Sequence, residues 1–140
     1  MLKSIIKATE NFCIHQIRTP HTIKEGISKN KTLIAYIDIE ENSGKIYRVY
    51  IASEMGFIQR VSKLFLDEED SDEETLIDMT LETTNLIVGS AKVIAIKEER
   101  NPFTIKTPHF LKIDRFDCDY DDAKIIKVED DEMVIAIKEL

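Results

Sequence analysis

Residues 73–97, which read EETLIDMTLETTNLIVGSAKVIAIK, decide the fold because they are the longest stretch with the apolar spacing of an amphipathic helix. On a helical wheel one broad side collects apolar and small residues, namely Leu76, Ile77, Thr80, Thr84, Ile87, Val88, Ala91, Ile94 and Ala95. The acidic run 67–74 leads into this stretch and Asn101-Pro102 closes the section after it. We therefore predict one helix of about 37 Å that packs its apolar side on a sheet.

The segment before the acidic run predicts a helix, a strand pair and a second helix. Residues 1–17 space their apolar side chains as a helix does, and Thr19-Pro20 ends that helix. Residues 20–31 fit either a loop or an irregular edge strand. Two strands, 32–39 and 45–52, are joined by the turn residues Glu41-Asn42-Ser43-Gly44.

A helix is expected directly after the second strand. Ser53 is a candidate N-cap, and the helix runs to about Leu66. The apolar spacing places five side chains inward, those of Met55, Ile58, Val61, Leu64 and Phe65.

The segment after the long helix predicts strands. Residues 103–105 and 110–113 are short candidates, and residues 123–128 and 133–138 form a hairpin around Glu129-Asp130-Asp131-Glu132. The order is therefore helix, two strands, two helices and then strands. This order favours an α+β fold in which long helices cover a mostly antiparallel β-sheet, as one domain over residues 1–140.

Composition excludes several classes of partner. The net charge is −8 and the sequence pI is about 4.9, which disfavours nucleic acid and anionic membranes. No stretch approaches the roughly 20 apolar residues of a membrane span, and residues 1–12 lack the apolar core of a signal peptide, so we expect a cytoplasmic protein. Cys13 and Cys118 lie in no metal-ligand spacing, and the three histidines are scattered, so no metal site is expected.

The side of the long helix opposite to its apolar side has an unusual composition. It carries Asp78, Glu82, Asn85, Gly89 and Ile96, bordered by apolar Leu81, Leu86 and Val93. Glycine inside a helix costs roughly 1 kcal/mol relative to alanine, and this one points outward. A polar strip with a small residue and an apolar border is typical of a surface against which a partner docks, although a plain solvated face remains the alternative.

Glu82 and Asn85 offer a narrow chemistry. They lie three residues apart, so their side chains are neighbours on the helix. A carboxylate can bind a cation, and an amide can hold a water molecule in a fixed orientation because it both donates and accepts hydrogen bonds. No strong nucleophile or base accompanies them on the strip. The pair therefore fits the role of completing the active site of another protein.

The same residues resemble the signature of the CheC/CheX/FliY phosphatase family, and its CheX branch most closely. That signature is Asp or Ser, Glu four residues later and Asn three further on, here Asp78, Glu82 and Asn85, with the small residue Gly89 a turn later. Thr84 departs from the glycine common at its position. The segments LKSIIKATENF, YRVYIASEMGFIQRVSKLF and FTIKTPHFLKI resemble the family's first helix, strand–helix unit and Thr-Pro segment, in the same order.

This resemblance implies a CheC/CheX-like fold and a response-regulator aspartyl-phosphate phosphatase. The implied partner is a phosphorylated CheY-type receiver that supplies its own Mg²⁺, so the chain would need no cofactor of its own. Glu82 would bind the receiver's lysine and Asn85 would orient the attacking water, with Asp78 and Gly89 contacting the partner. The resemblance also implies a homodimer.

Two other functions remain open from the sequence. One is a non-catalytic adaptor or flagellar-switch-associated module of the same fold, which binds a receiver without dephosphorylating it. The other is a structural dimer. The presence of Asn85 favours the phosphatase over the adaptor.

Overall fold

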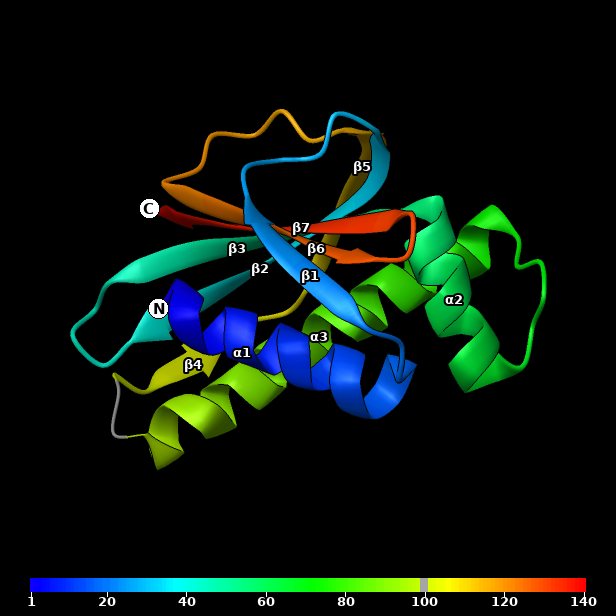
Figure 1. Ribbon diagram of the computed structural model, residues 1–140. Helices are drawn as coiled ribbons and strands as arrows, with labels where there is room; N and C mark the ends of the chain where they lie inside the picture. The colour runs from blue at the N-terminus through cyan, green and yellow to red at the C-terminus, as the bar shows by residue number, and fades with distance from the viewer. Residues whose placement is uncertain (99–100) are drawn as a thin grey trace.

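A single antiparallel sheet organises the computed structural model, which describes residues 1–98 and 101–140 (Figure 1). Its seven strands run in the order β1-β6-β7-β3-β2-β4, and β5 pairs with the same edge of β2 as β4. The strands are β1 (His21–Glu25), β2 (Lys31–Glu41), β3 (Ile46–Glu54), β4 (Phe103–Ile105), β5 (His109–Arg115), β6 (Asp122–Val128) and β7 (Asp131–Glu139).

Three helices complete the fold. They are α1 (Leu2–Phe12), α2 (Met55–Leu66) and α3 (Glu73–Lys97), and α1 continues into a π-helical turn, η1 (Cys13–Ile17). Figure 1 shows α1 and α3 side by side along one face of the sheet, with α2 at the end where α3 begins. No helix within residues 1–98 and 101–140 is long and apolar enough to cross a membrane.

The main core lies between the sheet and the helices. Alternate residues of β2, β3 and β7, such as Leu33, Ile51 and Ile135, meet the apolar sides of the helices and are fully buried. A smaller cluster lies on the other face of the sheet, where Phe116 packs over Ile34, Ala52, Val134 and neighbouring residues. Burial on both faces explains why the central strands are nearly continuous apolar runs.

Most predicted elements are confirmed, including the α+β class, the strand pair, the terminal hairpin and α3 from Glu73 to Lys97. The helix predicted over residues 1–17 is present, although its last five residues adopt π-helical rather than α-helical hydrogen bonding. Of the two alternatives for residues 20–31, the edge strand is found over His21–Glu25.

The prediction for α2 is wrong in its start and in part of its inward face. Strand β3 extends to Glu54, so Ser53 is a fully buried strand residue and not the N-cap. Glu54 precedes the helix, and its carboxylate accepts a hydrogen bond from the Glu132 backbone N–H at 2.6 Å instead of capping α2.

The inward face of α2 is formed by Phe57, Ile58, Val61 and Ser62. Ile58 and Val61 were predicted inward correctly, but Met55, Leu64 and Phe65 are 37%, 50% and 42% exposed. Helix α2 covers only the end of the sheet. Fewer of its apolar side chains are therefore buried than their spacing in the sequence predicts.

Candidate functional site

The candidate site lies on α3, whose start is fixed by a side-chain cap. Asp72 has extended backbone geometry, and its carboxylate accepts a hydrogen bond from the Thr75 backbone N–H at 2.8 Å. Glu73 and Glu74 follow in the first turn, where negative charge is favourable to the helix dipole. These interactions fix where the helix begins, and the packing of its buried side, from Leu76 to Ala95, fixes which side chains point outward.

The buried side of α3 contains three threonines directly beneath the candidate site. Thr80 and Thr84 donate their hydroxyls to the backbone carbonyls of Leu76 and Thr80, each at 2.8 Å. Thr83 is also fully buried, but its hydroxyl has no partner among the described residues. Thr84 therefore faces the protein interior, as predicted.

The exposed side of α3 carries the predicted site residues. Asp78, Glu82 and Asn85 are exposed, and Gly89 is half-buried. Among residues 1–98 and 101–140, no hydrogen bond or ion pair is formed by the side chains of Glu82 and Asn85. Helical geometry puts the Cβ atoms of this pair about 5–6 Å apart on one surface. A carboxylate and an amide are thus free and adjacent, available to a partner rather than engaged within the chain.

Gly89 leaves open space one helical turn beyond Asn85. A Cβ added at Gly89 would meet no atom within 4 Å. The glycine is therefore not required by packing inside this chain, and its position is compatible with the close approach of another molecule.

Apolar side chains flank the polar strip. Leu86, Val93 and Ile96 are 40%, 52% and 56% exposed, although each could have been polar at no cost to the core. Leu81 is half-buried. The strip and its apolar border form what we call the α3 face, defined by Asp78, Glu82, Asn85, Gly89 and the four apolar residues named here.

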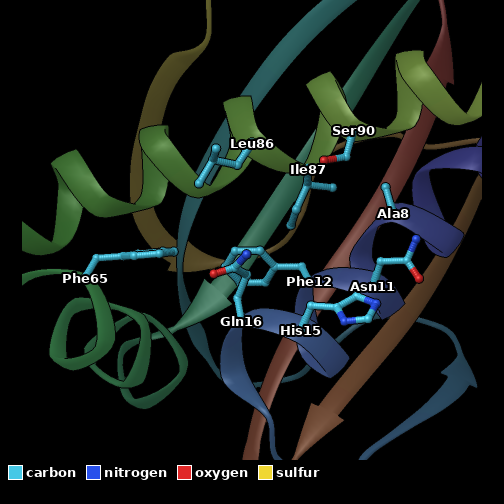
Figure 2. Close-up of a pocket in the computed structure, with 9 residues that line it drawn as sticks. All are labelled: Ala8, Asn11, Phe12, His15, Gln16, Phe65, Leu86, Ile87 and Ser90. Carbon is cyan, nitrogen blue, oxygen red and sulfur yellow. The ribbon is translucent and has the colours of Figure 1, made fainter.

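A pocket beside the α3 face is a feature that the sequence did not predict. Figure 2 shows it between α3, the α1–η1 helix and the end of α2. It is lined by Ala8, Asn11, Phe12, His15, Gln16, Phe65, Leu86, Ile87 and Ser90. The only signal in the sequence was the exposed Leu86, because the other residues come together through tertiary packing and through the π-helical turn.

The described residues contain no group of three or more His, Cys, Asp and Glu side chains able to hold a metal ion. The most perturbed thiol is that of Cys13, for which burial, assisted by Glu10, raises the pKa to about 12. That thiol lies in the core and is not a nucleophile at neutral pH. The chemistry available at the α3 face is therefore binding and positioning.

The family comparison gives a match over most of the chain. Residues 34–133 match the sequence profile of the family described as chemotaxis phosphatase CheX. A search of curated protein sequences found no match.

Solved structures with the same fold come from several bacteria. The chain resembles a putative chemotaxis protein of Desulfovibrio vulgaris Hildenborough, with a TM-score of 0.77 and 19% identity over 99% of this chain and 96% of that one. It resembles the chemotaxis protein CheX of Vibrio vulnificus, with a TM-score of 0.72 and 18% identity over 98% of both chains. A third structure is a CheX–CheY complex of Borrelia burgdorferi containing BeF₃ and Mg²⁺, with a TM-score of 0.69 and 17% identity over 99% of this chain and 97% of that one.

Proposed function

The chain belongs to the CheX family of chemotaxis phosphatases, and from this premise we propose that it removes the phosphoryl group from the aspartyl phosphate of a CheY-type receiver. The observation that carries the proposal is the pair Glu82 and Asn85, exposed, adjacent and without partners in the described part of the chain. The chemotaxis CheX of Borrelia burgdorferi forms a complex with CheY, which supports a receiver as the partner class.

Asn85 is the proposed catalytic residue. Its amide would enter the receiver's site and hold a water molecule in line with the phosphorus atom. The water oxygen forms the new bond to phosphorus while the bond to the aspartate oxygen breaks, which yields phosphate and a free carboxylate. Positioning is sufficient in such a reaction because phosphoryl transfer requires little covalent chemistry from the helper protein.

Glu82 is the proposed anchor. Its carboxylate is exposed and pairs with no cation among residues 1–98 and 101–140, so it is available to the receiver's lysine. Asp78 lies one turn before Glu82 on the same face and adds negative charge toward the same partner. Gly89 is proposed to let the partner's backbone approach the helix. The Mg²⁺ of the reaction is proposed to come with the receiver, as the BeF₃–Mg²⁺ complex of the relative suggests by analogy.

The protein is proposed to act in the cytoplasm as a homodimer of single-domain chains. The substrate would be a cytoplasmic receiver, which requires the enzyme in the same compartment. Neither nucleic acid nor a membrane is proposed as a partner, since the net charge is −8.

The decisive experiment follows phosphate loss from a phosphorylated CheY receiver of the same organism in the presence of Mg²⁺. Wild type should accelerate the loss. Asn85→Ala should lower kcat by about 10²-fold or more because a positioning group is removed. Full activity of Asn85→Ala would show that the water is positioned by another group.

The anchor is tested by the same assay with a different expected signature. Glu82→Ala should raise KM more than it lowers kcat, since it removes a contact to the receiver. Glu74→Ala is the matched control, because Glu74 is an exposed carboxylate in the first turn of the same helix. If wild type binds the receiver but leaves the rate of phosphate loss unchanged, the protein is an adaptor and not a phosphatase.

A further inference from the structure

The pocket beside the α3 face has an apolar floor and a polar rim. Phe12, Ile87 and Ala8 are buried at its base. Asn11, His15, Gln16 and Ser90 surround the opening, together with Phe65 and Leu86, as Figure 2 shows. In the part of the chain that the structure describes, no lysine, arginine, aspartate or glutamate lines it. The pocket therefore suits an apolar group and offers no pairing for a charged one.

The pocket is continuous with the α3 face. Glu82, Leu86 and Ser90 are spaced four residues apart and form one row along α3. The first is the proposed anchor, and the other two line the pocket. At 1.5 Å per residue, Leu86 and Ser90 lie about 6 Å and about 12 Å from Glu82 along the helix axis. A partner that contacts Glu82 over an interface of about 800 Å² per side can therefore reach the pocket as well.

The wall opposite α3 has an unusual backbone. Residues Cys13–Ile17 form a π-helical turn that ends at Arg18, whose φ is 59°. The Arg18 backbone N–H donates to the Cys13 carbonyl at 2.8 Å, and its side chain donates to the His15 carbonyl at 3.2 Å. A π turn and a left-handed non-glycine residue both cost conformational energy, and such features concentrate at functional sites. Here the turn presents His15 and Gln16 to the pocket.

One aromatic residue at the pocket is exposed and a second lies buried beside it. Phe12 and Phe65 have ring centroids 6.3 Å apart at an interplanar angle of 51°, so they form a corner rather than a closed stack. Phe65 is 42% exposed despite its size. Aromatic residues at a pocket in the centre of an interface are typical of the positions that contribute most to binding.

The size of the pocket decides what it can hold. Its volume is about 290 Å³, just below the range of about 300–1,000 Å³ found for small-molecule sites. Resting on the receiver docking described under the proposed function, we propose that this pocket takes one large apolar side chain, aromatic by preference, from the surface of the receiver. The pocket thereby determines which receiver binds, while Glu82 and Asn85 act on the phosphorylated site that all receivers share.

The test fills the pocket without altering the α3 face. Ser90 is exposed at the rim, so Ser90→Phe places a ring in the pocket at little cost to folding. Lys97→Phe is the matched control, because Lys97 lies two turns further along nearly the same side of α3 and lines no part of the pocket. The measurement is the Kd for the organism's CheY receiver loaded with Mg²⁺ and beryllofluoride, and thermal unfolding checks that each variant is folded.

We expect Ser90→Phe to weaken binding about tenfold or more, and Lys97→Phe to bind within about twofold of wild type. A second variant, Phe65→Gln, makes the α2 wall of the pocket polar without touching the α3 face, and it should also lose about tenfold. Wild-type affinity in both pocket variants would overturn the proposal.

The outcomes also separate this proposal from the proposed function. If wild type binds no loaded receiver and accelerates no phosphate loss, the proposed function itself fails. If wild type binds and hydrolyses but the pocket variants match it, only the pocket proposal fails.

Discussion

Two glycines lie within helices and differ in what surrounds them. The difference shows at which of the two positions a side chain would disturb the fold. A Cβ added at Gly89 meets nothing within 4 Å, whereas one added at Gly56 would overlap the carboxylate of Asp131. Asp131 is held there by Arg60, whose Nη2 donates to Oδ2 at 2.8 Å. A side chain at position 56 would therefore displace the Asp131 carboxylate from its ion pair with Arg60, whereas one at position 89 would displace no described residue.

Gly89→Ala should consequently stabilise the isolated protein while weakening its complex. Removing a glycine from a helix interior raises the free energy of unfolding by about 0.5–1 kcal/mol. The added methyl group would separate the receiver from the helix, so the Kd for the beryllofluoride-loaded receiver should rise. Urea unfolding and a binding titration measure the two effects. An unchanged Kd would remove Gly89 from the interface.

Gly56→Ala is the control for that experiment. It should lower the free energy of unfolding by about 1–3 kcal/mol because the methyl group and Asp131 cannot occupy the same space. A stabilised Gly56→Ala variant would contradict this account of Gly56 and Asp131.

Cys13 gives a prediction about pH. Its pKa is raised from 9.0 to about 12, first by burial and second by Glu10. The thiol is therefore neutral in the folded state, and thiol reagents at neutral or mildly alkaline pH should modify it only after unfolding.

Because the folded pKa is the higher one, the contribution of Cys13 to stability is complete below pH 9.0 and is lost as the pH rises toward about 12. Cys13→Ala should flatten the fall of the unfolding midpoint in that window relative to wild type, and equal slopes would contradict the assignment.

At the scale of elements, α3 depends on its N-cap. The hydroxyl of Thr75 and then its backbone N–H hold the pKa of Asp72 below its usual value of 3.8. The stabilisation from this carboxylate is present above pH 3.8 and is lost as the pH falls through the lower folded value. Asp72→Ala should lower the thermal unfolding midpoint at neutral pH, and Asp72→Asn should retain most of it because an amide oxygen also caps. A midpoint gap between wild type and Asp72→Asn that persists unchanged below the folded pKa would contradict the role of the charge.

The elements also show how far the sequence predicts this structure. Helix α3 was predictable at both ends because Asp72 caps it and its buried side follows one period from Leu76 to Ala95. Helix α2 was not, since Glu54 precedes it without a side-chain cap and the sheet covers too little of it to bury Leu64 and Phe65. The π-helical turn has no sequence signature, although Arg18 closes it with its backbone N–H on the Cys13 carbonyl and its side chain on the His15 carbonyl. The exposed pair Glu82 and Asn85 followed from helical periodicity, but the pocket beside it required the tertiary arrangement.

The edges of the sheet bear on how two molecules associate. One edge is β1, a five-residue strand whose side chains are mostly exposed. The other edge is shared by β4 and β5, which are separated by Pro108 and carry a register shift opposite Ile34 and Ala35. Proline and irregular pairing protect an edge from association, so β1 is the edge better suited to pairing with a second copy. Exchange of β7 would instead require opening the middle of the sheet, because β7 lies between β6 and β3.

A dimer paired through β1 would leave both α3 faces open. Helix α3 packs over β2 and contacts β4 and β5, which lie at the edge of the sheet opposite to β1. We therefore expect a particle of twice 16.2 kDa that binds two receivers, one per chain, without loss of affinity at the second site. Sedimentation equilibrium of the free protein and of its complex with beryllofluoride-loaded receiver measures both quantities. A mass of 16.2 kDa at all concentrations would exclude the dimer, and one receiver per dimer would place the interface on the α3 face instead of β1.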